Sequence, residues 1–61
     1  MVYVHEYISA VADGLTNRDA RAIMSARAVA ADWMIEKREQ AALLKIADAA
    51  LEAVEELGLN E

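Results

Sequence analysis

The side chains that could carry out chemistry are few and lie far apart in the sequence. His5 is the only histidine and stands beside Glu6, near one end of the chain. A histidine that acts as an acid, a base or a metal ligand needs further partners, and the sequence places none next to it. Ser9 and Ser25 have no evident base and do not stand on a sharp glycine turn, as a serine hydrolase requires. We therefore expect a protein that is not an enzyme.

The remaining candidate ligands are carboxylates and aromatic residues. Asp32 and Glu36 lie one helical turn apart, but no Glu-x-x-His motif completes a carboxylate-bridged metal site. The chain has no cysteine, which excludes disulfides and thiolate metal sites, so we expect no bound metal or cofactor. Trp33 is expected in the core or as the anchor of a protein interface. Tyr3 and Tyr7, one turn apart, are expected as packing residues or as half-exposed contacts.

Length and composition indicate a small folded domain that needs support. The chain has 61 residues, of which 57% are hydrophobic and 28% charged, enough apolar surface to fold. A core of this size is small, so self-association or a partner protein is expected to add stability. The net charge of −5 disfavours nucleic acids as partners. With no apolar run near the roughly 18 residues of a membrane span, and no basic signal segment, we expect one cytoplasmic domain over residues 1–61 without a membrane partner.

Apolar spacing and one glycine predict a first helix and a turn. Apolar residues recur at the spacing of one helical face over residues 2–13, where we expect this helix. Gly14 can end it, because glycine adopts the left-handed cap conformation easily. A turn is therefore expected over residues 14–16, and either Thr16 or Asn17 can cap the helix that follows.

The stretch over residues 17–57 has no proline and no glycine and is rich in alanine. As one helix of about 40 residues it would extend roughly 60 Å. The polar segment 36–40 interrupts the apolar pattern on every side and is where a bend would lie. All of its residues form helices well, and no turn residue marks a loop there. The sequence favours a continuous helix, with a helical hairpin as the alternative.

A seven-residue apolar repeat predicts an antiparallel coiled-coil contact in this stretch. When the stretch pairs with a reversed copy, Trp33 faces Leu44, and Lys37 faces Gln40 at the centre. The pairing is self-complementary, as a two-fold interface must be, so we expect a homodimer. A hairpin would make the same contacts within one chain. The residues of this heptad seam are Ile23, Ala26, Ala30, Trp33, Lys37, Gln40, Leu44, Ala47, Leu51 and Val54.

Charges are distributed along the same stretch in the order that an antiparallel neighbour favours. Basic residues crowd its start and acidic residues its end, the reverse of what the macrodipole of a lone helix prefers. An antiparallel neighbour places the basic end beside the acidic end, with Arg27 opposite Asp48. We expect this pair to set orientation more than to add stability.

A second apolar strip lies opposite the heptad seam. Its first part, expected under the first helix, is Met24, Ala28, Ala31 and Ile35. Its later part, expected to stay uncovered in a simple dimer, is Ala42, Ile46, Ala49 and Ala53. An uncovered apolar strip is a candidate binding surface. The predicted partner surface comprises Asp48, Glu52, Glu55, Glu56, Ile46, Tyr3 and Tyr7.

One segment is similar to a DNA-binding motif. Residues 11–19 read Val-Ala-Asp-Gly-Leu-Thr-Asn-Arg-Asp, and residues 25–29 read Ser-Ala-Arg-Ala-Val. The first block resembles the entry to the helix-turn-helix of LuxR-type regulators, and the second resembles the beginning of their recognition helix. The resemblance implies a DNA-binding regulator in which Arg18, Arg21 and Arg27 contact phosphates or bases.

Taken together, these patterns predict an all-α protein. A short N-terminal helix and one long helix, or a helical hairpin, are expected to form an antiparallel helical bundle by dimerisation. We expect a protein–protein interaction module, because an acidic, alanine-lined helical surface can dock on a basic or apolar patch of another protein. Small acidic proteins of this kind are often inhibitors or adaptors, including phage-encoded ones. A small helix-turn-helix DNA-binding regulator is the alternative.

Overall fold

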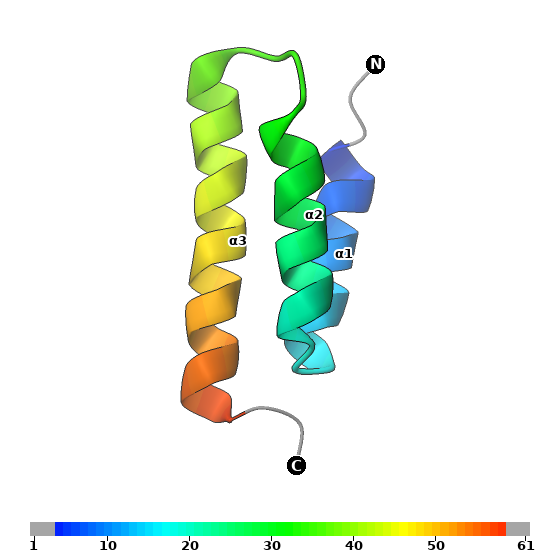
Figure 1. Ribbon diagram of the computed structural model, residues 1–61, viewed down its shortest axis with the longest axis vertical. Helices are drawn as coiled ribbons and strands as arrows, with labels where there is room; N and C mark the ends of the chain where they lie inside the picture. Colours follow the sequence, from blue (N-terminus) through cyan, green and yellow to red (C-terminus); the bar gives the residue numbers. More distant parts are fainter. Residues whose placement is uncertain (1–3, 59–61) are drawn as a thin grey trace.

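The computed structural model describes residues 4–58, and within this range it contains three α-helices and no strand. The helices are α1 (Val4–Thr16), α2 (Ala20–Ala31) and α3 (Lys37–Leu57). Consecutive helices run antiparallel, and each helix packs against the other two (Figure 1). The all-helical class is confirmed, and the stretch expected as one long helix or a helical hairpin forms two helices.

The stretch over residues 17–57 is interrupted, so the prediction of one continuous helix is wrong. The chain leaves α2 after Ala31 and folds back over residues 32–36 before α3 begins at Lys37. The bend therefore precedes most of the polar segment 36–40, which supplies the first turn of α3. This placement agrees with the good helix propensity of those polar residues.

A side chain stabilises the bend where the sequence has no glycine or proline. The last carbonyl groups of an α-helix lack partners within the helix. Gln40 Nε2, on the first turn of α3, donates to the carbonyl oxygens of Ala30 at 3.0 Å, Ala31 at 2.9 Å and Trp33 at 3.2 Å. The amide group of one helix thus caps the C-terminal end of the other, which helps α2 to stop at Asp32 without a glycine or proline.

The turn between α1 and α2 also lies later than expected. The prediction that Gly14 ends the first helix is wrong, because α1 continues to Thr16. Arg18 takes the left-handed cap position, with φ of 52°. The N–H of Asp19 donates to the Gly14 carbonyl at 2.7 Å, and the N–H of Arg18 to the Leu15 carbonyl at 3.1 Å. These two hydrogen bonds form a Schellman motif, which satisfies the last carbonyls of α1.

Asp19 caps the N-terminus of α2, in place of the expected Thr16 or Asn17. Its Oδ1 accepts a hydrogen bond from the N–H of Ala22 at 3.2 Å. A short acidic side chain suits this position, since it satisfies a free N–H group and lies at the positive end of the helix macrodipole. Asp19 therefore both completes the end of α1 and begins α2.

Gly14 has a packing role in place of the expected capping role. It is buried in α1, and a Cβ atom added there would lie 2.5 Å from Ile23 Cγ1 of α2. Atoms at that distance overlap, so only glycine lets the two helices approach this closely. At the other end of the structure α3 stops at Leu57, and Gly58 follows with φ of 89°.

The apolar residues of the heptad seam are covered within one chain. Ile23, Ala30, Ala47 and Val54 are at most 1% exposed. The contacts that the sequence assigned to a second copy are therefore made between α2 and α3, and these buried side chains are not available to another chain. Lys37 remains exposed at the start of α3. The complete core is Tyr7, Val11, Ile23, Ala30, Leu43, Ala47, Ala50 and Val54, with Ala26, Trp33, Leu44 and Leu51 partly buried against it.

Candidate functional site

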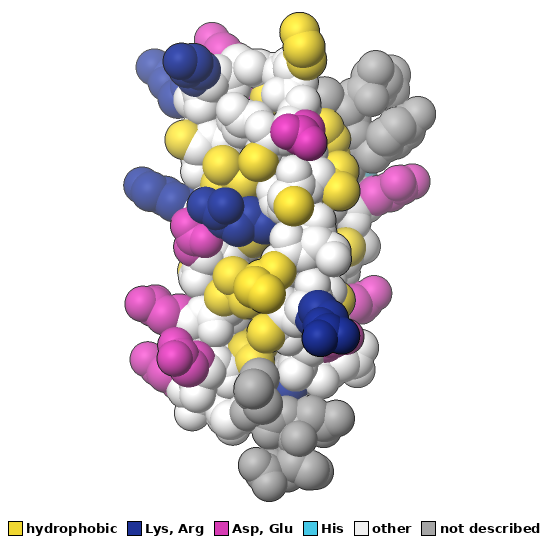
Figure 2. All heavy atoms as spheres, viewed as in Figure 1, with side chains coloured by type: hydrophobic (Ala, Val, Ile, Leu, Met, Phe, Trp, Pro, Cys, Tyr) yellow, Lys and Arg dark blue, Asp and Glu magenta, His cyan; other side chains and the backbone are white. Residues whose placement is uncertain are grey.

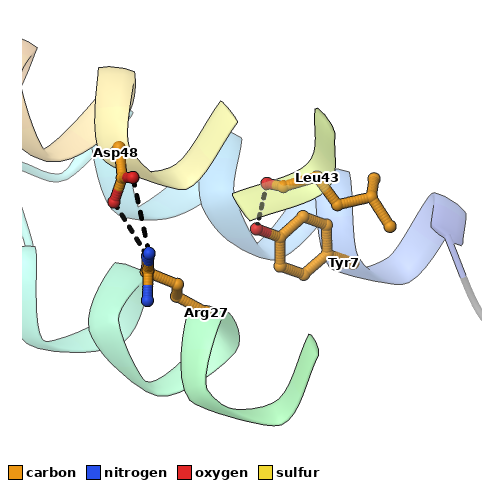
Figure 3. Close-up of polar contacts among 4 residues, drawn as sticks. All are labelled: Tyr7, Arg27, Leu43 and Asp48. Atoms are coloured by element: carbon orange, nitrogen blue, oxygen red, sulfur yellow. Dashed lines mark hydrogen bonds and ion pairs between the residues drawn. The ribbon is translucent and has the colours of Figure 1, made fainter. Parts of the chain in front are cut away.

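Arg27 and Asp48, the residues expected to set orientation, form an ion pair between α2 and α3 of the same chain (Figure 3). Arg27 Nε lies 2.8 Å from Asp48 Oδ1, and Nη2 lies 3.4 Å from Oδ2. The two side chains are 38% and 55% exposed, so solvent screens the pair and its contribution to stability is about 0–1 kcal/mol. With its carboxylate engaged by Arg27, Asp48 is a weaker candidate for contact with a partner.

Tyr7, expected on the partner surface, is buried in the core with 4% of its surface exposed. Its hydroxyl donates a hydrogen bond to the Leu43 carbonyl of α3 at 2.5 Å (Figure 3). Its ring meets the edge of Trp33, with centroids 5.6 Å apart and planes inclined at 66°. Burial raises the pKa of Tyr7 above its usual value, while Arg27 lowers it and Asp48 raises it. Tyr3 lies outside the described residues.

An open hollow between α1 and α2 is the first of two apolar grooves. This α1/α2 groove has a volume of about 280 Å³. Its lining residues are Glu6, Tyr7, Ala10, Ala26, Val29 and Trp33. Val29 is 57% exposed, while Tyr7 and Trp33 hold each other in place at one wall. The groove therefore combines a fixed aromatic wall, small residues and one carboxylate.

The second groove lies between α1 and α3. This α1/α3 groove has a volume of about 290 Å³ and is lined by Ile8, Val11, Ala12, Leu15, Ile46, Ala49, Ala50 and Ala53. Ile8 is 42% and Ile46 40% exposed. A smaller hollow lined by Val4, Glu39, Ala42 and Leu43 lies between the same two helices. The later part of the second apolar strip, from Ala42 to Ala53, thus borders the hollows beside α1.

The first part of that strip is not covered by α1, so its expected position is wrong. Met24 is 52% exposed, and Ala28 and Ala31 are also exposed. Gly14 instead packs against Ile23, on a different side of α2. Ile35 alone of this group is partly buried against the core.

The acidic residues of the predicted partner surface lie along the second half of α3. Glu52, Glu55 and Glu56 are all exposed there. Figure 2 shows basic side chains along the upper part of the α3 edge and acidic side chains along its lower part. The surface of α3 thus changes sign along its length, from positive at its beginning to negative at its end.

The residues considered for catalysis or metal binding do not gather into a site. His5, Ser9 and Ser25 are exposed on α1 and α2. Among residues 4–58 no group of three or more histidine, aspartate and glutamate side chains is arranged to hold a metal ion. Within the same range, no helix is both long enough and apolar enough to cross a membrane.

The segment that resembles a helix-turn-helix has a different geometry. A helix-turn-helix joins two helices by a short turn, whereas the helix entered after residues 11–19 and the segment 25–29 lie on one uninterrupted helix, α2. Arg18 occupies the left-handed turn position, and Arg27 is paired with Asp48. Of the three arginines implied as DNA contacts, Arg21 is exposed on α2.

Comparison of the chain with protein-family models, with curated proteins and with solved structures finds no match. Its function is therefore argued from its own surface. The α1/α2 groove was missed by sequence reasoning because Tyr7 and Trp33 were assigned separate roles. A signal for it was present, since positions 26, 29 and 33 have the spacing of one helical face, although Trp33 itself follows the end of α2.

Proposed function

We propose that this chain is a non-enzymatic protein-interaction module, a small inhibitor or adaptor, that binds an amphipathic basic helix of another protein. The α1/α2 groove carries the proposal, because it is an open apolar hollow with a carboxylate among its lining residues. Such a groove suits the helix-in-groove mode, in which one apolar side of a helix inserts between two helices of its partner.

The lining of the groove favours a helix with one or two large apolar side chains. Ala10 and Ala26 leave room for an incoming side chain, and Val29 adds exposed apolar area beside it. Trp33 forms a wall whose position is fixed by its contact with Tyr7. A wall that is already ordered loses little conformational entropy on binding, which favours affinity. Met34, next to Trp33 in the chain, is 97% exposed and can adapt to a partner's surface.

The charge beside the groove favours a basic partner. Glu6 lines the groove, and Asp13 follows Ala10 on the same side of α1, since positions 6, 10 and 13 share one helical face. The whole chain carries a net charge of −5. Lysine or arginine on the flank of the bound helix would meet these carboxylates, which would steer its approach and fix its direction. The module would act by occupying the helix of its partner, which blocks that helix or joins it to another protein.

The single tryptophan of the chain lines this groove and provides the test. The probe is an amphipathic leucine–lysine helical peptide, with a leucine–glutamate peptide of the same pattern as its counterpart. We expect saturable binding of the lysine peptide with a shift in Trp33 emission, and no binding of the glutamate peptide.

Two α2 variants locate the binding site. Val29→Lys places a positive charge in the groove and should abolish binding, whereas Met24→Lys makes the same change at a position outside it. Val29 and Met24 are 57% and 52% exposed, so both variants should fold. Equal loss of binding in the two variants, or equal binding of the two peptides, would contradict the proposal.

A further inference from the structure

The α1/α3 groove is a separate apolar surface, on the other side of α1 from the α1/α2 groove. Ile8 of α1 and Ile46 of α3 line it with 42% and 40% of their surfaces exposed, beside the small residues Ala12, Ala49 and Ala53. Large exposed isoleucines among alanines form a surface on which another helix can pack closely. The charges that border this surface indicate which helix that is.

Four exposed charged residues follow the side of α3 that borders Ala42 and Ala49. They are Arg38, Lys45, Glu52 and Glu56, and their spacing of seven, seven and four residues keeps them on one face of the helix. None of them forms an ion pair with another residue of the range 4–58. The two basic residues come first and the two acidic residues last.

This order matches α3 with a reversed copy of itself. When two α3 helices pack antiparallel about a two-fold axis near residues 47 and 48, residues on one flank of each helix meet the same flank of the other. Arg38 then lies beside the partner's Glu56, and Lys45 lies beside the partner's Glu52, and symmetry repeats both pairs. In a parallel arrangement this flank of one helix would meet the opposite flank of the other, so the four residues would not pair with one another.

The apolar residues fit the same register. Around an axis near residues 47 and 48, Ile46 lies level with the partner's Ala49, and Ala42 lies level with the partner's Ala53. Large side chains therefore meet small ones, which lets two helices interdigitate at close range. Ile8 and Ala12 of α1 border the same groove and would add apolar contacts at its edge.

We infer that the α1/α3 groove binds a second copy of this chain, with the two α3 helices antiparallel. To match this flank, a helix of another protein would need basic residues at its beginning and acidic residues at its end. A second α3 helix already has its charges in that order. This interface differs from the heptad seam, whose apolar residues are buried or partly buried within one chain. It also leaves the α1/α2 groove open, so a dimer would present two such grooves and bind two partner helices.

Sedimentation equilibrium of the full chain and of charge-reversed variants tests the inference. We expect a monomer–dimer equilibrium for the unchanged chain. Lys45→Glu and Glu52→Lys should each weaken association by about tenfold, the equivalent of about 1.4 kcal/mol over the two symmetric pairs. The double variant Lys45→Glu/Glu52→Lys restores opposite charges and should associate like the original chain.

Arg21→Glu and Glu55→Lys are the matched controls, since they make the same changes of charge at exposed positions away from the α1/α3 groove. They should leave association unchanged, and circular dichroism should show the same helix content in every variant. A chain that stays monomeric at about 1 mM overturns the inference, because even a weak dimer forms at that concentration. A double variant that fails to recover, or controls that weaken association as strongly, would also overturn it.

Discussion

Replacing Gly14 by alanine is expected to destabilise the protein, although the same change usually stabilises a helix. Within a helix alanine is favoured over glycine by roughly 0.5–1 kcal/mol. Here the new Cβ would lie 2.5 Å from Ile23 Cγ1 and 3.3 Å from Ile23 Cδ1. Carbon atoms normally pack about 3.5–4 Å apart, so Ile23 must leave its rotamer or the helices must separate. Such overpacking costs about 1–3 kcal/mol, and because the overlap at 2.5 Å is severe, we expect the upper half of this range and a net loss of about 1–2.5 kcal/mol.

Urea unfolding followed by circular dichroism measures this loss, and a double-mutant cycle identifies its cause. Ile23→Ala removes the two side-chain atoms that the new Cβ would meet and leaves only the Asp19 carbonyl oxygen at 3.3 Å, so Gly14→Ala in that background should become close to neutral or stabilising. Trimethylamine N-oxide in all samples helps to keep the weakened background folded. Two results would refute the reasoning: a Gly14→Ala variant that is more stable than the original chain, or an equal loss in both backgrounds.

Three other substitutions test contacts that position the helices. Tyr7→Phe removes the hydrogen bond to the Leu43 carbonyl and should lower the free energy of unfolding by about 1 kcal/mol. Burial raises the pKa of Tyr7, so the stability that its neutral hydroxyl contributes is present below about pH 10 and is lost as the pH rises through the folded-state pKa. The melting temperature of the original chain should therefore exceed that of Tyr7→Phe below about pH 10, and this difference should shrink at higher pH. Gln40→Glu replaces the amide that donates to the Ala30 carbonyl with a carboxylate, which can only accept, and should lower the free energy of unfolding by about 1–3 kcal/mol at neutral pH. Thermal melts near pH 4 should show a smaller loss, because the new carboxyl is partly protonated there. Arg18→Gly relieves a left-handed backbone with φ of 52° and should raise stability by about 1 kcal/mol in urea unfolding.

The sequence indicated the helical faces well because they depend on local spacing. The apolar repeat placed Ile23, Ala30, Ala47 and Val54 on one side of the stretch, and these four residues are the most buried of the heptad seam. It could not indicate whether that side closes within one chain, because a hairpin and a dimer make the same contacts. One contact that closes it within the chain is the amide of Gln40 on the end of α2, a hydrogen bond that spans the bend and follows no helical or strand spacing.

The end of α1 was predicted wrongly because its position depends on packing against α2. Gly14 was expected to cap α1, since glycine takes the left-handed conformation easily, but its lack of a side chain is needed where α1 meets Ile23. The left-handed position then falls to Arg18, a residue type that does not signal it. Tyr7 likewise could not be placed from the sequence, because its hydrogen-bond partner, Leu43, lies on the third helix.

The order of the charged residues along the chain predicts an antiparallel neighbour but does not identify which charges pair within the chain. The order of charges along the stretch 17–57 predicted an antiparallel neighbour, and Arg27 and Asp48 lie against each other across α2 and α3. Arg38, Lys45, Glu52 and Glu56 lie elsewhere on α3, where no described residue pairs with them. The sequence alone does not distinguish the paired charges from the unpaired ones, because the bend over residues 32–36 decides which side of α3 remains exposed.

The central claim is that α2 and α3 close the heptad seam within one chain and leave the two grooves beside α1 for partners. The chain has no cysteine, so Arg27→Cys/Asp48→Cys creates a unique pair of thiols at the ion-paired positions. A short bis-maleimide reagent, followed by intact mass spectrometry, then reports whether the two positions share a chain. The structure predicts a bridged product with the mass of a single chain. A product with the mass of two chains, joined between positions 27 and 48, would contradict it.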